Sequence, residues 1–375
     1  MEENKDINQE PEIVKEGDER LEQPDFFLAE GKPKSLWYYS WRRLKRNRLA
    51  MAGLYVLIFM VLVALLADFI APFNPNAQIL EFATKTMGFK GNVLVKNVDP
   101  NESENPYIPI QSVTKEENGT VYYKDYAGRD MEIPLADLTP GGREKWNRTL
   151  TFILGTDRFG RDILSRLIYG ARISLSVGLI SETIAVFIGV LMGAFAGFFR
   201  GATDKVIMWV VNVVWAFPSI LFVIAISVVL GKGFWQAFVA IGLTGWVDVA
   251  RIVRGQFFSL RETEYVEATR AVGFKAPRII LRHILPNSLG PVIVIGTAGF
   301  ATAIIFEASL SFLGLGVQPP TASWGQMIFD GYKYIIAGTN WGLAVFPSLA
   351  IMITVFAVNL LGDGIRDAFD PKLKR

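Results

Sequence analysis

EYVEATRAVGFKAPRIILRHILPN, residues 264–287, is a polar stretch that lies between long apolar segments. Thr263–Val272 contains residues compatible with a helix, and Gly273 is suited to end it, because glycine readily adopts the left-handed conformation found after a helix C-terminus. Pro277 fits the first turn of a second helix, and Pro286 is expected to close that helix. The stretch therefore predicts a unit of two short helices joined by a turn.

One face of the first short helix carries the residues Tyr265, Ala268 or Thr269, and Val272. A lipid interface could hold such a unit. A simple membrane bundle does not require one, however, and a unit of this shape can transmit force if a soluble partner grips it.

The rest of the chain surrounds this stretch with candidate membrane spans. Of the 375 residues, 51% are hydrophobic, and the mean hydropathy is +0.31, an average that soluble domains rarely reach. Crossing the hydrocarbon core takes roughly 20 apolar residues in a helix. The segments that meet this requirement are residues 49–71, 174–199, 206–230, 235–253, 288–312 and 340–361.

The distribution of Arg and Lys predicts the side on which each short loop lies. The short loops on one outer side offer only Lys232 and Lys333. The loops on the other side and the C-terminal tail are rich in basic residues: Arg200, Lys205, Arg251, Arg254, Arg261, Arg270, Lys275, Arg278, Arg282, Arg366, Lys372, Lys374 and Arg375. We therefore expect both termini in the cytoplasm and residues 74–150 outside the cell membrane.

The first 35 residues are acidic and polar and contain no apolar run. They are expected to form a disordered cytoplasmic tail rather than a cleaved signal peptide. The following residues 36–73 are expected to form an amphipathic lead-in and the first span. Residues 151–366 are expected to hold the other five spans, and residues 367–375 a cytoplasmic tail.

Several kinds of site are excluded by composition. The chain contains no cysteine and one histidine, His283, so a structural zinc site, a disulfide framework and a Cys nucleophile are ruled out. The segment Gly155–Asp162 comes nearest to a phosphate-binding loop, but it lacks the lysine and the hydroxyl that such a loop needs. We therefore expect no ATP hydrolysis by this chain, and we expect His283 to be a docking or interfacial residue.

The outer segment 74–150 is too long for a plain connector. Gln111–Lys115 and Thr120–Tyr126 are β-prone runs on either side of Asn118-Gly119, a pair typical of a type I′ turn, and Met131–Pro134 follows a further turn. The segment predicts a small β-rich subdomain. Its role is either a passive cap or contact with a protein that delivers the ligand.

Two features within the spans bear on packing. Gly189, Gly193 and Gly197 make one face of the second span nearly smooth, so that another helix can approach closely. That helix belongs either to this chain or to a partner subunit. Pro218 removes a backbone hydrogen bond and is expected to kink the third span.

The family resemblance rests on the polar stretch and on motifs along the spans. Glu267-Ala268-Thr269, Gly273 and Leu285-Pro286 resemble the "EAA" loop of ABC importer permeases, with Thr269 in place of the usual second alanine. The segments Leu154–Asp157, Arg282–Asn287, Leu310–Gly316 and Asn359–Asp367 are similar to the dipeptide and oligopeptide permease branch, of the oligopeptide permease C type. The resemblance covers residues 36–73 and 150–375, and the segment 74–150 departs from it.

The resemblance implies an all-α membrane protein with six transmembrane helices, in the type I ABC importer permease fold, carrying a small β-rich extracytoplasmic insert. It implies a second homologous permease subunit, one or two ATPase subunits and an extracytoplasmic solute-binding protein as partners, besides membrane lipid, and no nucleic acid. ATP and Mg would be bound by the ATPase subunits, and no cofactor by this chain.

The resemblance also implies that the cytoplasmic loop 254–287 couples this chain to the ATPase. The residues expected to serve that coupling are Glu264, Tyr265, Glu267, Ala268, Thr269, Gly273, Leu285 and Pro286.

Ionisable groups within spans are costly and usually face a cavity. Glu182 in the second span, Asp248 in the fourth and Glu307 in the fifth are therefore candidates for the substrate pathway, and Asn212 could offer a further polar contact. A carboxylate in the pore could receive the α-amino group of a peptide, and Glu182 is the preferred candidate. Glu307 could instead serve packing or gating, and Asp248 could pair with Arg251 or Arg254.

The expected function is import of dipeptides or oligopeptides across the cytoplasmic membrane, driven by partner ATPases. Glutathione and nickel-chelate importers share the same motifs, although one His and no Cys argue against direct metal binding by this chain. A stand-alone secondary transporter would predict ion sites or inverted repeats within the spans, and no convincing repeat is found. A membrane-bound enzyme is disfavoured by the lack of Cys, of metal-ligand spacing and of any His within a span.

Overall fold

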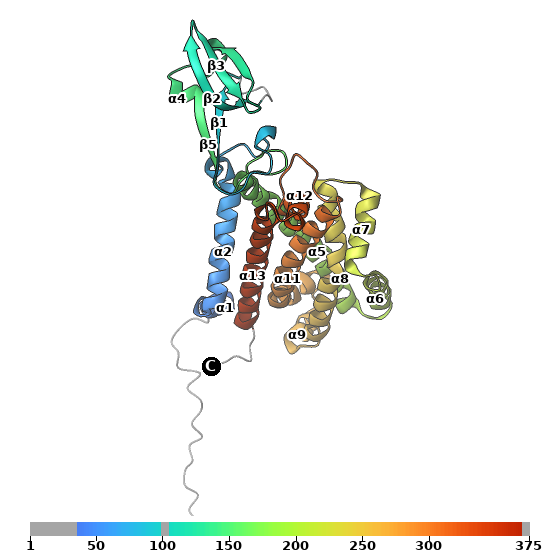
Figure 1. Cartoon of the computed structure of the whole chain (residues 1–375). Coiled ribbons are helices and arrows are strands. Elements are labelled where there is room, and N and C mark those ends of the chain that lie inside the picture. The colour runs from blue at the N-terminus through green and yellow to red at the C-terminus, as the bar shows by residue number, and fades with distance from the viewer. Residues whose placement is uncertain (1–35, 99–104, 370–375) are drawn as a thin grey trace, which may run out of the picture.

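The computed structural model describes residues 36–98 and 105–369, so the expected tail 1–35 and most of the expected tail 367–375 lie outside the described residues. The described chain has two parts, a bundle of long helices and a small β-sheet at one end of it (Figure 1). This arrangement confirms the predicted fold class.

The long helices of the bundle begin at identifiable sequence signals. Asn47 caps α2 (Arg48–Leu65) by accepting from the backbone N–H groups of Leu49 and Ala50, and Asp162 caps α5 (Ile163–Phe199) by accepting from Ser165 N–H. The remaining long helices are α8 (Phe234–Leu260), α11 (Leu285–Phe312) and α13 (Gly342–Phe369). By length and apolar composition, five helices of the described chain can each cross a membrane.

The third expected span, residues 206–230, is not a single kinked helix. The structure divides it into α6 (Gly201–Trp215) and α7 (Ser219–Leu230), which are bent by 90° relative to each other. Pro218 occupies the N-cap of α7, where its missing N–H costs no helical hydrogen bond. The count of spans becomes six only if this bent pair is one crossing.

Other helix bounds also differ from the expected ones. The second expected span began at residue 174, whereas α5 begins at Ile163. A further amphipathic helix, α12 (Trp324–Ile336), was not predicted and lies between α11 and α13 along the chain. The short helices are α1 (Leu36–Arg46), α3 (Ala67–Ile70), α4 (Arg143–Trp146), α9 (Glu264–Ala271) and α10 (Ala276–Ile279).

The segment 74–150 contains most of a five-stranded antiparallel sheet with strand order β4-β3-β2-β1-β5. Its strands are β1 (Phe89–Val95), β2 (Tyr107–Glu117), β3 (Thr120–Asp125), β4 (Asp130–Pro134) and β5 (Asn147–Phe152). The hairpin predicted around Asn118-Gly119 is confirmed, because both residues have the positive φ, 51° and 74°, that a type I′ turn requires. Strands β1 and β5 were not predicted.

Hydrogen bonds from side chains of the bundle hold the linker that leads into the sheet. Arg166 on α5 donates to the carbonyl of Pro75, and Asn340 before α13 donates to the carbonyl of Lys85. Gly160 lies so close to the backbone of Ile79 that any Cβ at this position would collide with it. The linker into the sheet is therefore packed on the bundle.

At the opposite end of the bundle, α1 and the end of α13 lie together (Figure 1). Leu44, Ala50 and Ala368 form one buried cluster there. Both described ends of the chain are therefore on the same side of the bundle, away from the sheet.

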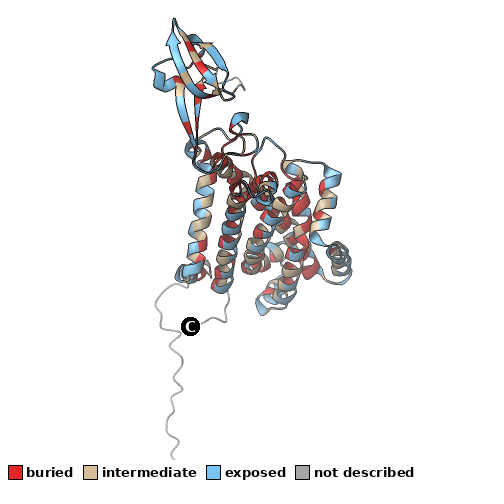
Figure 2. Cartoon of the chain, viewed as in Figure 1, coloured by how far each residue is buried: buried red, intermediate tan, exposed pale blue. Residues whose placement is uncertain are grey.

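The interior of the bundle is centred on the contact between α5 and α8. Buried residues line the inner faces of the helices, and the outer face of α2 is largely exposed (Figure 2). Gly189, Gly193 and Gly197 all pack on α8: a Cβ at Gly193 would lie 2.5 Å from the carbonyl oxygen of Ala250. The smooth face predicted from the glycine spacing is therefore used within this chain and is not available to a partner subunit.

We expect Gly193→Val to destabilise the folded protein, because the added side chain forces α5 and α8 apart. Overpacking of this kind costs roughly 1–3 kcal/mol. The melting temperature of the purified protein in detergent should fall. Gly255→Val is the matched control, because a Cβ at Gly255 on α8 meets nothing within 4 Å. Equal melting temperatures for the two variants would contradict the packing argument.

Candidate functional site

The loop 254–287 is folded against the end of the bundle opposite the sheet. Val266 on α9 is fully buried and joins a cluster that includes Phe198 of α5 and Phe257 of α8. Arg261 reinforces this contact by donating to the carbonyl of Phe198 at 2.5 Å. A movement of α9 must therefore also displace the ends of α5 and α8 that pack against it.

The turn after α9 confirms the predicted role of Gly273 in ending the helix. Gly273 N–H bonds to the carbonyl of Arg270, and Phe274 N–H bonds to the carbonyl of Thr269. This pair of bonds is a Schellman motif. Gly273 has φ of +86°, and a Cβ there would meet nothing within 4 Å, so backbone conformation rather than space requires glycine.

The outward face of α9 is partly apolar. Tyr265 and Val272 are 41% and 74% exposed, and Ala268 between them is exposed too. This is the face predicted from the spacing of the sequence. Glu264 and Glu267 lie in the first turn of α9, where negative charge complements the helix dipole. Thr269 is half-buried and donates its hydroxyl to the carbonyl of Val266 at 2.7 Å, so it does not alter the outward face.

The second short helix differs from its prediction. Pro277 does lie in the first turn of α10, as predicted. Pro286, however, does not close the helix. A π turn, Ile280–Ile284, joins α10 directly to α11, and Pro286 lies in the first turn of α11. The expectation failed because proline is equally compatible with the end of one helix and the start of the next.

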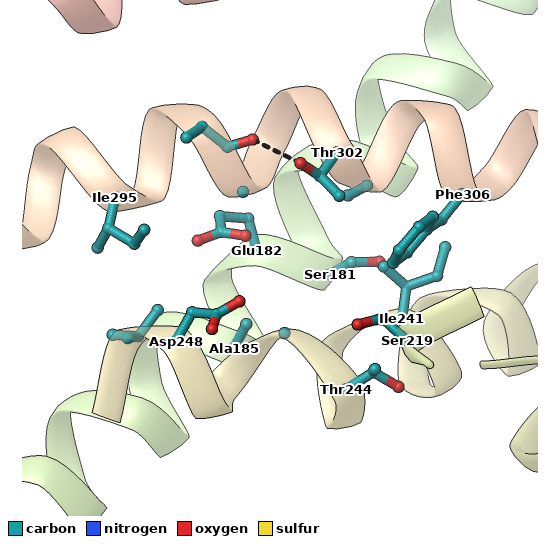
Figure 3. A pocket seen from close by; sticks show the side chains of 15 residues that line it. Ser181, Glu182, Ala185, Ser219, Ile241, Thr244, Asp248, Ile295, Thr302 and Phe306 are labelled. Atoms are coloured by element: carbon teal, nitrogen blue, oxygen red, sulfur yellow. Dashed lines mark hydrogen bonds between the residues drawn. The ribbon is translucent and has the colours of Figure 1, made fainter. Parts of the chain in front are cut away.

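The bundle contains a cavity of about 150 Å³. Figure 3 shows the side chains that line it. Helices α5, α7, α8 and α11 form its walls. Two carboxylates, Glu182 of α5 and Asp248 of α8, line it together. The hydroxyl groups that line it belong to Ser181, Ser219, Thr244 and Thr302.

The carboxylate of Glu182 reaches the cavity because α11 has glycine beside it. A Cβ at Gly299 would collide with this carboxylate. Its Oε1 atom is buried and has no hydrogen-bond partner among the described residues. On another side, Glu182 borders an apolar groove of about 860 Å³ between α2, α5, α11 and α13. A buried carboxylate oxygen without a partner is costly, which suits a half-buried group that binds a ligand in transit.

Asp248 does not pair with either of the arginines that were considered for it. Arg251 donates to Asn212 Oδ1 at 3.1 Å, and Arg254 binds Asp204 at 2.5 Å. In the described part of the chain, no ion pair involving Asp248 is formed within 4 Å, and its side chain is exposed. The basic residues nearby are therefore already engaged, and Asp248 faces the cavity with Glu182.

Two protein-family models match this chain. Residues 189–375 match the family model described as "Binding-protein-dependent transport system inner membrane component", and residues 35–87 match "N-terminal TM domain of oligopeptide transport permease C". The chain is 37% identical over 336 residues to the dipeptide transport system permease protein DppC of Bacillus subtilis, covering 90% of this chain and 86% of that protein. The chain belongs to this permease family.

Two further relatives are informative. The oligopeptide transport system permease protein OppC of Bacillus subtilis is 35% identical over 344 residues, 92% of each chain. The glutathione transport system permease protein GsiD of Pectobacterium atrosepticum is 43% identical over 221 residues, 59% of this chain and 73% of that protein.

The chain is thus a multi-pass inner-membrane permease subunit of an ABC transporter. It is not itself an enzyme, since ATPase partners hydrolyse the ATP, and a solute-binding protein is a further partner.

The other two pathway candidates of this permease lie outside the cavity. Glu307 is fully buried on α11 and accepts hydrogen bonds from Ser311 at 2.8 Å and Ser174 at 3.5 Å. These contacts favour the packing role that was considered for it. Asn212 on α6 holds Arg251, whose guanidinium also lies over the ring of Trp215 at 4.0 Å.

A buried ionic cluster explains the motif Asp157–Asp162 of this permease. Arg161 binds Asp157 at 2.6 Å, and Asp330 on α12 receives Arg158 at 3.0 Å and Arg161 at 3.7 Å. Burial raises the pKa of the Asp330 carboxyl, and the arginines oppose that shift. The motif therefore fixes α12 against the start of α5.

Sequence reasoning missed the cavity hydroxyls and Gly299. A hydroxyl within an apolar helix often bonds to its own backbone, as Thr244 does to the carbonyl of Ala240, so its presence alone signals nothing. Ser219 and Thr302 can be recognised as cavity residues only in the tertiary structure, which places α7 and α11 beside Glu182.

Proposed function

We propose that this permease forms, with a second homologous subunit, the pathway of an importer of dipeptides or oligopeptides in the cytoplasmic membrane. The observation that carries the proposal is the cavity with two carboxylates that pair with no basic residue in the part of the chain that the structure describes. Every linear peptide with a free N-terminus carries an α-ammonium group that could bind them. The two Bacillus subtilis relatives are a dipeptide and an oligopeptide permease by name, which supports the same substrate class.

The proposed orientation places α9 and both chain termini in the cytoplasm and the sheet outside. The clustering of α1, α9 and the end of α13 at one end of the bundle supports it (Figure 1). Basic residues lie at that same end: Arg261 is the C-cap of α8, Arg270 lies in α9 and Arg278 in α10. The long segment 74–150 lies at the other end.

We further propose that one or two ATPase subunits bind the loop 254–287 through the outward face of α9. Tyr265, Ala268 and Val272 offer an apolar patch, and Glu264 and Glu267 lie next to it. An exposed apolar surface with a charged border is typical of a protein interface. Gly273 holds the turn that orients this patch, and Val266 links it to α5 and α8.

In the cavity, Glu182 and Asp248 would hold the α-ammonium group of the peptide while hydroxyl groups accept or donate along its backbone. The apolar part of the lining, including Ile241, Ile295 and Phe306, tolerates side chains of different shapes. The cavity would therefore recognise what all peptides share and leave side-chain selection to the solute-binding protein.

Glutathione is the second candidate substrate, because one relative is a glutathione permease by name and is 43% identical over 59% of this chain. Glutathione also has an α-ammonium group, so the cavity alone does not separate it from other peptides. Competition between labelled trialanine and unlabelled glutathione for uptake does so. If glutathione at equal concentration suppresses most of the trialanine uptake, glutathione replaces peptides as the proposed substrate.

We expect Gly273→Ala to weaken coupling between peptide and ATP hydrolysis. Alanine in the left-handed conformation costs roughly 1–2 kcal/mol, so the turn after α9 should change shape and misplace the patch. In proteoliposomes containing the complete transporter, peptide-stimulated ATPase activity should fall, while basal activity and membrane insertion persist. Gly255→Ala is the control, because this helical glycine has open space around it. Coupling that is unchanged in Gly273→Ala would argue against docking through this loop.

We expect Glu182→Gln to lower the uptake of trialanine by roughly 10- to 100-fold. A hydrogen bond to a charged group contributes about 1.5–3 kcal/mol, and each 1.4 kcal/mol is about tenfold. The uptake of N-acetyl-trialanine, which has no ammonium group, should change little. Glu116→Gln, on the exposed part of β2, is the charge-matched control. Equal losses for both peptides would show that Glu182 does not bind the amino group.

A further inference from the structure

The junction between the loop and α11 contains a step in the helix. In the π turn Ile280–Ile284, the N–H of Leu285 bonds to the carbonyl of Ile280, five residues back instead of four. A π turn accommodates one residue more than an α-helix of the same length, and one residue corresponds to a rotation of about 100°. The helix before the turn is therefore rotated relative to the helix after it.

Pro286 supplies a reason for this step in the sequence itself. Within an unbroken α-helix, the ring of Pro286 would press on the carbonyl of Arg282, four residues back, and its nitrogen could donate no hydrogen bond. In the observed structure Pro286 lies in the first turn of α11, where proline is tolerated. Asn287 Nδ2 donates to the carbonyl of His283 at 2.7 Å, which compensates for part of the disturbed helical bonding.

The step has a consequence for packing. Ile279 and Ile284 are 2% and 0% exposed and belong to one buried cluster with Val266 and Phe198. Five residues of a regular α-helix would place these two isoleucines about 140° apart, on different faces. Beyond the turn, Ser288 and Val292 continue the buried face of Ile284 at intervals of four residues. The π turn therefore brings α10 and α11 onto the same core.

We propose that Pro286 is a positioning residue of the coupling loop: it locks the π turn and so sets the rotation of α10 relative to α11. Because α9 shares the buried cluster, this rotation also holds α9 in one orientation relative to α11. Helix α11 carries Gly299, which lies beside Glu182. Pro286 acts through this register and not through contact with the ATPase. The inference rests on the proposed docking of the ATPase at α9.

The test uses two mutations that each disturb the π turn and that should compensate for each other when combined. Deleting Leu281, whose side chain is 64% exposed, places Ile279 and Ile284 four residues apart, as a regular α-helix requires, but leaves Pro286 clashing with Arg282. Pro286→Ala removes the clash but allows the helix to slip into α geometry and turn Ile279 outward. The double variant permits a regular helix with both isoleucines buried. Leu281→Ala measures the loss of the leucine side chain alone.

The readouts are co-purification with the ATPase, basal ATPase activity and peptide-stimulated ATPase activity of the complete transporter in proteoliposomes. We expect Pro286→Ala to lose several-fold of the stimulation, and the deletion of Leu281 to lose at least about tenfold because of the proline clash. The double variant should co-purify with the ATPase and regain the stimulation shown by Leu281→Ala. Recovery by a deletion is not expected for a residue that merely stabilises the loop.

Three results would overturn the inference: full stimulation in Pro286→Ala, full stimulation after deletion of Leu281 alone, or a double variant that is uncoupled or fails to assemble. These results are distinguishable from a failure of the docking proposal. If docking at α9 is wrong, Gly273→Ala is also fully coupled. If docking holds and only the register inference is wrong, Gly273→Ala is impaired and the double variant shows no recovery.

Discussion

The close packing of α5 on α8 is the contact on which the rest of the bundle depends. Three glycines on α5 allow the two helices to approach until the backbone of one meets the side chains of the other, as at Gly193 and Val253. Without a large hydrophobic driving force between helices in lipid, such close approach supplies the dispersion energy that holds them. Glu182 projects from α5 and Asp248 from α8, so this contact also brings the two carboxylates into one cavity.

The same two helices join the cavity to the loop. α8 leads into the segment that carries α9, and the C-terminal end of α5 contributes Phe198 to the cluster in which Val266 is buried. α11 completes the connection, because it begins at the π turn and carries Gly299 beside Glu182 farther along. The candidate docking face and the candidate substrate cavity are thus two regions of one packed unit, and a displacement at α9 has a direct mechanical route to the cavity.

Much of the architecture could be predicted from the sequence because the signals are local. Apolar length identifies the long helices, and Asn118-Gly119 specifies its hairpin because few other residue pairs adopt positive φ twice in succession. Gly273 and Pro277 similarly mark one helix end and one helix start through their own backbone preferences. Glu182 could be singled out as a candidate, because an ionisable residue within a span is costly and therefore rare.

The amino-acid sequence by itself thus determined five of the expected spans as helices, through their apolar length. It also determined the central hairpin of the sheet and the turn after α9, through backbone preferences that act within a few residues. Only the tertiary structure decided the 90° break at Pro218, the π turn before Pro286, and the separation of Glu182 and Asp248 from Glu307 and Asn212. A proline permits a kink, an end or a beginning, and burial of residues such as Ile279 and Ile284 selects among them. In the same way, a polar residue within a span acquires its role from the helices that lie beside it.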